Sequence, residues 1–413
     1  MKRVRTRPAA MERRARALPA IALGLLAAQA CTVAATATNT TTTTATAAAA
    51  AAATPATAAT APSGPGAAPQ VHHRAFGPVR LLRPAAAPTA VVIVVSATGG
   101  WNADALELAR RYAAQGALAI GVDARSYAAK SRAAPQGAHR LAIDFEALAH
   151  DLEKQCGVPA YLLPWLAGTG DGERLATAVL ADAPRGTFAA ALAPARLPPR
   201  EVGEAAPLPN LPLVEVPASP ATHHPALAVM LSGDGGWAGL DQDVAAALSR
   251  QGVPVVGWSS LRYFWSAREP AAAAADLARV IEHYVANWQR HDVVLLGYSF
   301  GAEVLPFLVN RLPAGARSHV RALVLIAPST TASFEVHVSD WLPGPDGGGL
   351  PTLPEARQLG ALPVLCLHGR SDHDSLCDRI TAPLWQSVEL GGGHHFGGDY
   401  EGLAARVLRF VAS

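Results

Sequence analysis

The sequence predicts an α/β fold built from two tandem α/β-hydrolase-like units with mainly parallel sheets, of which the first unit is incomplete. Three observations support this prediction. Short, continuous apolar runs alternate with amphipathic helical patterns, which is typical of buried parallel strands covered by helices on both faces. A long stretch of the chain recurs 136 positions later. Each copy then reaches a glycine-bracketed pentapeptide, GTGDG at 168–172 and GYSFG at 297–301.

The repeat aligns without a gap over its first part. Residues 96–127 begin SATGGW and residues 232–263 begin SGDGGW. Four identical pairs share the 136-residue offset: Trp101 and Trp237, Gln115 and Gln251, Gly121 and Gly257, and Tyr127 and Tyr263. Solenoid repeats are about 20–50 residues long, so this period indicates duplicated domains. We expect a degenerate hydrolase-like domain at 71–200 and a catalytic domain at 201–413.

The second copy reads as an alternation of strands and helices. Apolar runs predict strands at 226–231, 253–256, 292–296, 322–327 and 363–367. Helical patterns occupy 241–251, 270–289, 302–312 and 400–411. Pro306 lies inside one of these helices and is expected to bend it.

The N-terminal 70 residues carry targeting features. Seven basic residues within the first sixteen precede an apolar run from Leu18 to about Ala28, so residues 1–30 are interpreted as an export signal peptide. The alternative is a disordered basic tail before a buried helix. Cys31 follows directly, which leaves a lipoprotein anchor there as a further alternative. Residues 31–70, almost only Ala, Thr, Pro and Gly, are expected to form a flexible tether.

Composition narrows the function classes. Half of the 413 residues are apolar, which is ample for a folded core. The formal charge of +2 includes the many N-terminal arginines, so the remainder of the chain is close to neutral and we expect no nucleic-acid partner. No later segment has eighteen consecutive apolar residues, so we expect no membrane-spanning helix after the signal. We also expect neither a metal nor another cofactor.

Ser299 is the predicted nucleophile. GYSFG lies between an expected strand and an expected helix, the setting that a nucleophile elbow requires. The first copy has Gly170 at this position and ends without an equivalent acid or histidine loop, so residues 71–200 are predicted to perform no covalent chemistry. Instead they are expected to pack on the second copy or shape access to it.

A serine nucleophile needs a base and an orienting acid, and in this fold they follow it in the order acid, then histidine. Two aspartates, Asp372 and Asp374, follow the predicted strand at 363–367. The glycine-rich loop GGGHHFGGDY at 391–400 offers His394 or His395 as the base. Both choices remain open from the sequence, with Asp372 and His394 preferred. His368 and His283 are interpreted as packing or surface residues.

Two backbone N–H groups must stabilise the oxyanion. One is predicted to come from Phe300, directly after the nucleophile, and the other from Gly233 or Asp234 in the loop SGDGGW. Tyr263, Phe264 and Trp265 follow a strand end, where they either line a lipid-facing mouth or pack in the core. Trp237 is a further candidate for substrate binding.

Cys366 and Cys377 flank the acid loop. In an exported protein they are expected to form a disulfide that pins this loop to its strand, the alternative being two buried thiols. Cys31 and Cys156 have no evident partner.

Taken together, SGDGGW, LRYFW, GYSFGAEVLPF, the LC…DSLC loop and GGHHF resemble the VirJ and AcvB proteins of bacteria. The resemblance spans about 75–413 and is to the long, two-copy AcvB-like form. It implies an α/β-hydrolase fold, a periplasmic location, association with type IV secretion and virulence in some members, and hydrolysis of aminoacylated phosphatidylglycerol, such as the lysyl lipid, in others. We therefore expect a serine esterase with a membrane phospholipid substrate. The alternatives are a binding or scaffold component of a secretion system and a generic carboxylesterase.

Overall fold

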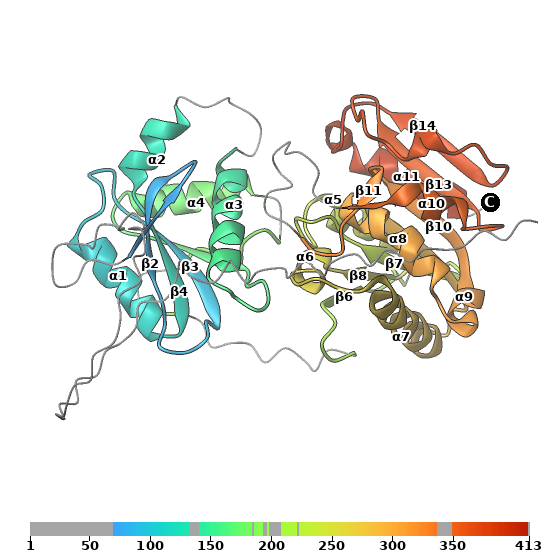
Figure 1. The fold of residues 1–413 in the computed structure, drawn as a ribbon, viewed down its shortest axis with the longest axis horizontal. Coiled ribbons are helices and arrows are strands. Elements are labelled where there is room, and N and C mark those ends of the chain that lie inside the picture. Colours follow the sequence, from blue (N-terminus) through green and yellow to red (C-terminus); the bar gives the residue numbers. More distant parts are fainter. Residues whose placement is uncertain are drawn as a thin grey trace, which may run out of the picture. The chain divides into compact units, whose positions relative to one another are not determined.

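Two β-sheets organise the chain (Figure 1). A computed structural model describes residues 69–132, 140–183, 186–192, 196–197, 208–220, 223–336 and 349–411. The expected signal peptide, Cys31 and nearly all of the expected tether lie outside the described residues. Among the helices that are described, none is long and apolar enough to cross a membrane.

The first sheet has five strands in the order β1-β2-β4-β3-β5. Its strands are β1 (Gln70–His73), β2 (Gly77–Leu82), β3 (Ala90–Val95), β4 (Ala117–Val122) and β5 (Pro164–Gly168). The last three are parallel, whereas β1 and β2 pair in antiparallel fashion. Its helices are α1 (Ala103–Ala114), α2 (Ala124–Ser131), α3 (Arg140–Gln155) and α4 (Gly172–Asp182).

The second sheet has seven strands in the order β14-β13-β10-β9-β7-β8-β6. They are β6 (Leu213–Val216), β7 (Ala226–Leu231), β8 (Val255–Trp258), β9 (Asp292–Tyr298), β10 (Val320–Ile326), β13 (Val364–Gly369) and β14 (Trp385–Leu390). Only the edge strand β6 is antiparallel to its neighbour. This order, with one antiparallel edge strand, is that of an α/β hydrolase, so the predicted fold class is confirmed.

Helices cover both faces of the second sheet. They are α5 (Leu240–Arg250), α6 (Ser260–Tyr263), α7 (Pro270–Trp288), α8 (Phe300–Asn310), α9 (Ala314–His319), α10 (Thr352–Arg357) and α11 (Tyr400–Val411). Two 3-10 turns (Cys377–Arg379 and Phe396–Gly398) and the short pair β11 (Thr331–Ala332) and β12 (Leu350–Pro351) complete the unit.

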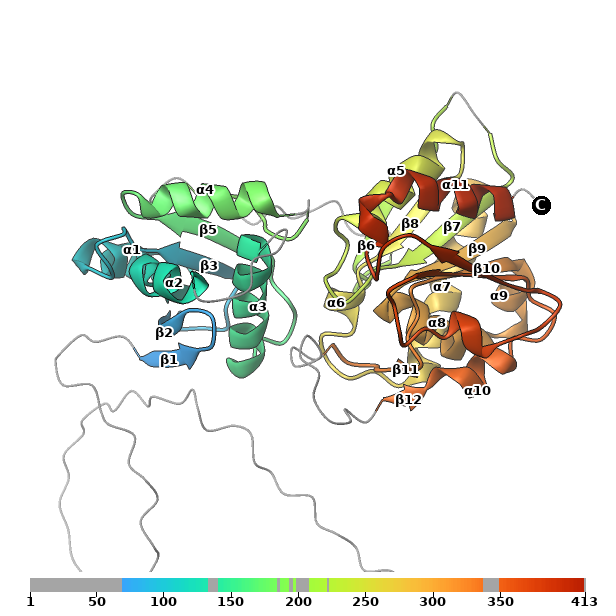
Figure 2. The same ribbon diagram turned by 90° about the horizontal axis from the view of Figure 1, so that it is seen from above.

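Alternate residues of each central strand enter two different cores. Leu227 and Val229 of β7 pack with α7 and α8, whereas Ala228 and Met230 pack with α5 and α11. Figure 2 shows α5 and α11 side by side on one face of the sheet. Burial on both faces explains why the central strands are continuous apolar runs rather than alternating ones.

The duplication extends to individual hydrogen bonds. The hydroxyl of Ser96 donates to the Ala97 carbonyl (3.0 Å) and accepts from the Ala124 N–H (3.1 Å). Ser232, its counterpart, donates to the Gly233 carbonyl (2.9 Å) and accepts from the Ser260 N–H (2.9 Å). Because unrelated sheets would not share this hydrogen-bonding pattern, the two copies have the same fold.

Side chains connect the two copies, and residues 55–413 form one compact unit. The indole N–H of Trp265 donates to the Val158 carbonyl at 2.7 Å, and Lys154 pairs with Glu335 at 3.0 Å. The rings of Tyr161 and Trp265 lie 5.2 Å apart. The first copy therefore packs on the second through α3 and the segment that follows it.

Candidate active site

Ser299 occupies a sharp turn between β9 and α8. Its backbone has φ 50° and ψ −118°, a conformation that non-glycine residues rarely adopt. A Cβ on Gly297 would lie 2.5 Å from the Ala302 nitrogen, and one on Gly301 would lie 2.3 Å from the Leu231 carbonyl oxygen. Only glycine fits at either position, and the turn presents the serine hydroxyl at the N-terminus of α8. This is the geometry of a nucleophile elbow.

Two further side chains extend a hydrogen-bonded line from that hydroxyl. The Oγ of Ser299 lies 2.8 Å from Nε2 of His394, and Nδ1 of His394 lies 3.1 Å from Oδ2 of Asp372. With Nδ1 protonated and bonded to the carboxylate, Nε2 is free to accept the serine proton. This nucleophile, base and orienting acid together can perform acyl transfer.

The alternative acid and base point elsewhere. Asp374 accepts a hydrogen bond from the Thr330 hydroxyl at 2.7 Å. His395 lies 2.8 Å from the Tyr298 hydroxyl through its Nδ1. Burial raises the pKa of Tyr298, so its hydroxyl keeps its proton and can donate to that ring. The structure thus brings Ser299, His394 and Asp372 together and gives Asp374 and His395 other partners.

The loop SGDGGW after β7 offers two amides for the oxyanion, those of Gly233 and Asp234. Asp241, buried at the start of α5 directly after this loop, has its pKa raised by that burial. The second donor is Phe300, which begins α8 and whose N–H has no partner within the helix.

The first copy provides an independent view of the same amide. Thr98 corresponds to Asp234 at the 136-residue offset, and Asp171 corresponds to Phe300 in the pentapeptides. The Thr98 N–H donates to the Asp171 carboxylate at 2.9 Å, and the Thr98 hydroxyl also donates to that carboxylate. The Thr98 amide therefore binds a negatively charged oxygen beside the first elbow, at the position that corresponds to Asp234 in the second copy. The comparison favours Asp234 over Gly233 as the oxyanion donor.

The first elbow keeps its shape without a nucleophile. Gly170 has φ 54°, close to that of Ser299. A Cβ on Gly168 or Gly172 would lie 2.4 Å from neighbouring backbone atoms, as in the second copy. Beyond β5 the described residues of the first sheet add only a short parallel bridge, between Leu166 and Ala191, and they include no acid or histidine loop. The described part of the copy thus retains the turn and lacks the chemistry.

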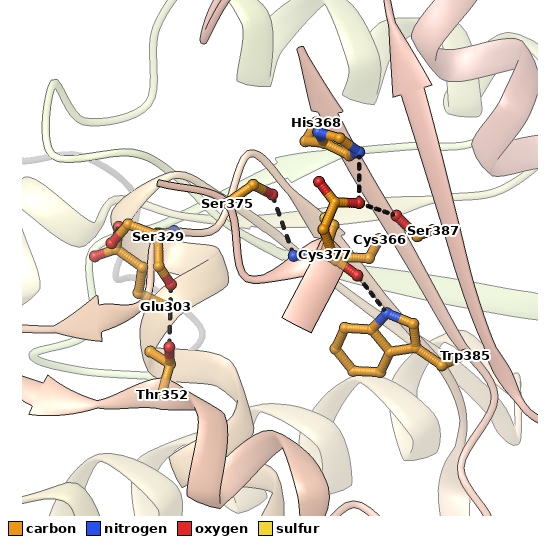
Figure 3. The surroundings of a disulfide bond; sticks show 10 residues. Glu303, Ser329, Thr352, Cys366, His368, Ser375, Cys377, Trp385 and Ser387 are labelled. Carbon is orange, nitrogen blue, oxygen red and sulfur yellow. Dashed lines mark hydrogen bonds and ion pairs between the residues drawn. A yellow bond between two sulfur atoms is a disulfide. The ribbon is translucent and has the colours of Figure 1, made fainter. Parts of the chain in front are cut away.

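The acid loop is fastened to the sheet at several points, and Figure 3 shows the disulfide and the bond from Trp385. Cys366 of β13 and Cys377 form a disulfide with a Cα–Cα distance of 5.3 Å. The Leu376 N–H donates to the Pro328 carbonyl at 2.9 Å. The Trp385 indole donates to the Cys377 carbonyl at 3.2 Å. These contacts hold the segment that carries Asp372 against β10 and β14.

The remaining histidines that the sequence singled out serve packing. His368 is buried and lies 3.3 Å from the Asp378 carboxylate, and His283 bonds to Asn287 on the surface of α7.

Glu303 is a buried carboxyl that sequence reasoning missed. It lies one helical turn after Ser299 and accepts a hydrogen bond from the Ser329 hydroxyl at 2.6 Å (Figure 3). Burial, together with the charges of Asp234 and Asp374, raises its pKa to about 7. The one sequence feature that points to Glu303 is its position four residues after Ser299. It gives little indication of burial, because carboxyls on helices usually face solvent.

The raised pKa of Glu303 predicts a pH-dependent stability. An unfolded glutamate ionises near pH 4.5, whereas folded Glu303 stays neutral until about pH 7, so this group destabilises the fold as pH rises between these values. Ionisation of Glu303 over this pH range lowers the free energy of unfolding by up to about 3 kcal/mol. Glu303→Gln, which cannot ionise, should show a flatter free energy of unfolding than the wild type from pH 4.5 to 7 in urea titrations. Parallel pH profiles of the two proteins would contradict the assignment.

The aromatic run after β8 requires a correction. Tyr263, Phe264 and Trp265 are at most 3% exposed and belong to the core between the sheet and α7. The Tyr263 hydroxyl donates to Asp276 at 2.6 Å, and Trp265 contacts the first copy. These residues therefore do not line a substrate mouth. Trp237 instead covers Gly257, where a Cβ would lie 2.5 Å from the indole ring.

The comparison with family models concerns the second copy. Residues 225–413 match the family model described as bacterial virulence protein (VirJ). No curated protein sequence matches the chain.

Among solved structures, the chain is similar to a lidless α/β serine hydrolase from Xanthomonas campestris, with 18% identity over 48% of this chain and 87% of that one (TM-score 0.34). It is also similar to Est1E from Butyrivibrio proteoclasticus, with 14% identity over 49% and 94% (TM-score 0.37). A third is the proline iminopeptidase of Mycobacterium smegmatis, with 13% identity over 48% and 93% (TM-score 0.35). The fold assignment itself rests on the strand order and the elbow of this chain.

Proposed function

Because residues 225–413 match the family model described as bacterial virulence protein (VirJ), we propose that the protein is a periplasmic serine hydrolase that cleaves aminoacylated phosphatidylglycerol. The observation that carries the proposal is the hydrogen-bonded line from Ser299 through His394 to Asp372. The bond cleaved is the ester between the amino acid and the glycerol headgroup. The location follows from the expected export signal.

The reaction follows from the positions of these groups. The Ser299 oxygen attacks the ester carbonyl while His394 Nε2 takes its proton, and Asp372 stabilises the resulting imidazolium. The N–H groups of Phe300 and Asp234 bind the oxyanion of the tetrahedral intermediate. His394 then donates its proton to the departing glycerol oxygen, which leaves the aminoacyl group on Ser299. A water molecule, deprotonated by His394, releases the free amino acid.

Charge around the nucleophile supports an aminoacyl ester in particular. Glu303 is close enough to Asp234 and Asp374 for both charges to raise its pKa. The negative charges of Asp234 and Asp374 near the serine favour an acyl group that carries an ammonium over one that is neutral or anionic. An aminoacyl group has such an ammonium next to its carbonyl.

The substrate assignment predicts a preference that kinetics can measure. Wild-type protein should hydrolyse lysyl-phosphatidylglycerol in mixed micelles with kcat/KM at least about tenfold above that for an acetyl ester of the same lipid, a difference of about 1.4 kcal/mol. Release of free lysine is the readout. Equal or higher kcat/KM for the neutral ester would indicate the alternative, a generic carboxylesterase.

A second candidate function is binding or scaffolding within a type IV secretion system that contributes to virulence. The observation that favours it is the first copy, which has no nucleophile yet keeps its fold and packs on the second. In this case Ser299→Ala would retain the biological effect, whereas substitutions on the surface of residues 71–200 would abolish it. Loss of the effect in Ser299→Ala would favour the hydrolase.

A further inference from the structure

A cavity of about 490 Å³ lies beside the oxyanion loop but does not include the catalytic groups. Its walls come from the segment after α3 in the first copy and from β6, the oxyanion loop and α6 in the second. Ser299, His394 and Asp372 are not among its lining residues. Pockets of about 300–1,000 Å³ typically hold small molecules, so this one has the size of a ligand site.

The wall of the cavity contains exposed apolar side chains. Leu163 and Val214 each remain 39% exposed, and both line the cavity. In the described part of the chain only three other large apolar side chains are comparably exposed, namely Ile143, Leu350 and Leu384. Concentrated apolar exposure marks a binding surface, because water contact at these groups costs free energy that a ligand would recover.

Two polar groups of the lining have no protein partner. The Tyr161 side chain is 3% exposed, and its hydroxyl makes no hydrogen bond within the described residues. Buried hydroxyls are nearly always bonded, so an oxygen from a ligand or water is expected beside it. Arg262 is exposed, and among the residues that the structure describes its guanidinium has neither an ion pair nor a hydrogen bond. An arginine without a partner at an apolar cavity favours an anionic group.

The carboxyls nearest to Tyr161 do not oppose an anion. Glu146 and Glu153 of α3 both lie close enough to influence its hydroxyl. Burial raises the pKa of Glu146 to about 8 and that of Glu153 to about 9, so both are largely neutral at pH 7. Arg262 therefore dominates the charge of the lining at this pH.

We propose that this cavity binds a single-chain anionic amphiphile, a long-chain fatty acid, with its aliphatic chain along Leu163 and Val214 and its carboxylate at Arg262. The volume suits one chain rather than the two of a phospholipid. The site is separate from Ser299 and does not require the proposed hydrolase activity.

Binding of palmitate to the full-length protein tests the proposal directly. Trp237 lines the cavity, so its fluorescence should change saturably with one palmitate bound per chain below the critical micelle concentration. Arg262→Gln should weaken binding about tenfold or more through loss of a charge-assisted hydrogen bond. Hexadecanol, which has the chain without the charge, should bind the wild type correspondingly more weakly. Val214→Asp should abolish binding, since it places a carboxylate against the chain.

Matched substitutions outside the cavity serve as controls. Arg406→Gln removes another exposed arginine, from α11, and Leu350→Asp replaces another exposed apolar side chain. Both should bind palmitate as the wild type does, and circular dichroism should show all four variants folded. No saturable binding by the wild type, or equal binding by wild type and Arg262→Gln, would overturn the proposal. So would binding only to phosphatidylglycerol vesicles and not to palmitate monomers.

Discussion

Replacing Ser299 with alanine is expected to lower kcat by about 10⁴-fold or more on any ester that the protein hydrolyses. The hydroxyl forms the acyl bond, and among the described residues Ser299 is the one hydroxyl or thiol within hydrogen-bond distance of His394 Nε2, at 2.8 Å. Initial rates on lysyl-phosphatidylglycerol and on an activated ester should fall together.

The oxyanion donors and the substrate contacts remain in Ser299→Ala, so KM should change little while kcat falls. A circular dichroism melt of the variant provides the folding control. The positive φ at this position persists in alanine, which carries a Cβ like serine, so no relief of strain is expected. Retention of more than a few per cent of wild-type kcat would mean that another residue performs the chemistry.

The second large effect distinguishes two adjacent histidines. His394→Ala should lower kcat by about 10⁴-fold or more, because the base that activates the serine is lost. His395→Ala should stay within about tenfold of the wild type, because its ring bonds to the Tyr298 hydroxyl and not to Ser299.

The two variants are matched controls for each other, since they remove the same side chain from the same loop. The pair separates loss of the base from general disturbance of the glycine-rich segment. Comparable losses in both variants, or a larger loss in His395→Ala, would contradict the assignment of the base.

The central strands and the elbow could be predicted because their signals are local. β7 and α11 have the predicted bounds, and the strand before Ser299 extends only two residues further than predicted. Continuous apolar runs mark strands that are buried on both faces. The edge strands β6 and β14 were not predicted, because each has exposed positions interspersed among partly buried ones and no apolar run. The helix after the elbow continues through Pro306 to Asn310.

The choice within each pair of site candidates could not be made from the sequence. Asp372 and Asp374 have the same chemistry and lie two positions apart. They differ in their partners, because Asp374 accepts a hydrogen bond from the Thr330 hydroxyl. Gly233 and Asp234 are distinguished only through the first copy, where the equivalent Thr98 amide donates to the Asp171 carboxylate. Such contacts depend on residues that are distant in the chain.

The sequence left the aromatic run open between a substrate mouth and the core for a related reason. Trp265 is buried partly by the first copy, where it meets Val158 and Tyr161. Tyr263 and Phe264 pack within the second copy, against Trp258 and Phe300. A strand end followed by aromatic residues has the same pattern whether it faces solvent or another domain. Contacts with the first copy therefore decide which residues of the second copy are exposed, and the sequence does not show these contacts.

Covalent labelling with a fluorophosphonate probe tests the central claim most directly, because only an activated serine reacts rapidly with it. We predict one adduct per chain, located on the peptide containing Ser299 by mass spectrometry, and its loss in both Ser299→Ala and His394→Ala. Labelling should persist in His395→Ala. An absence of labelling in the folded wild-type protein, or an adduct on a different serine, would contradict the account of this site as a serine hydrolase.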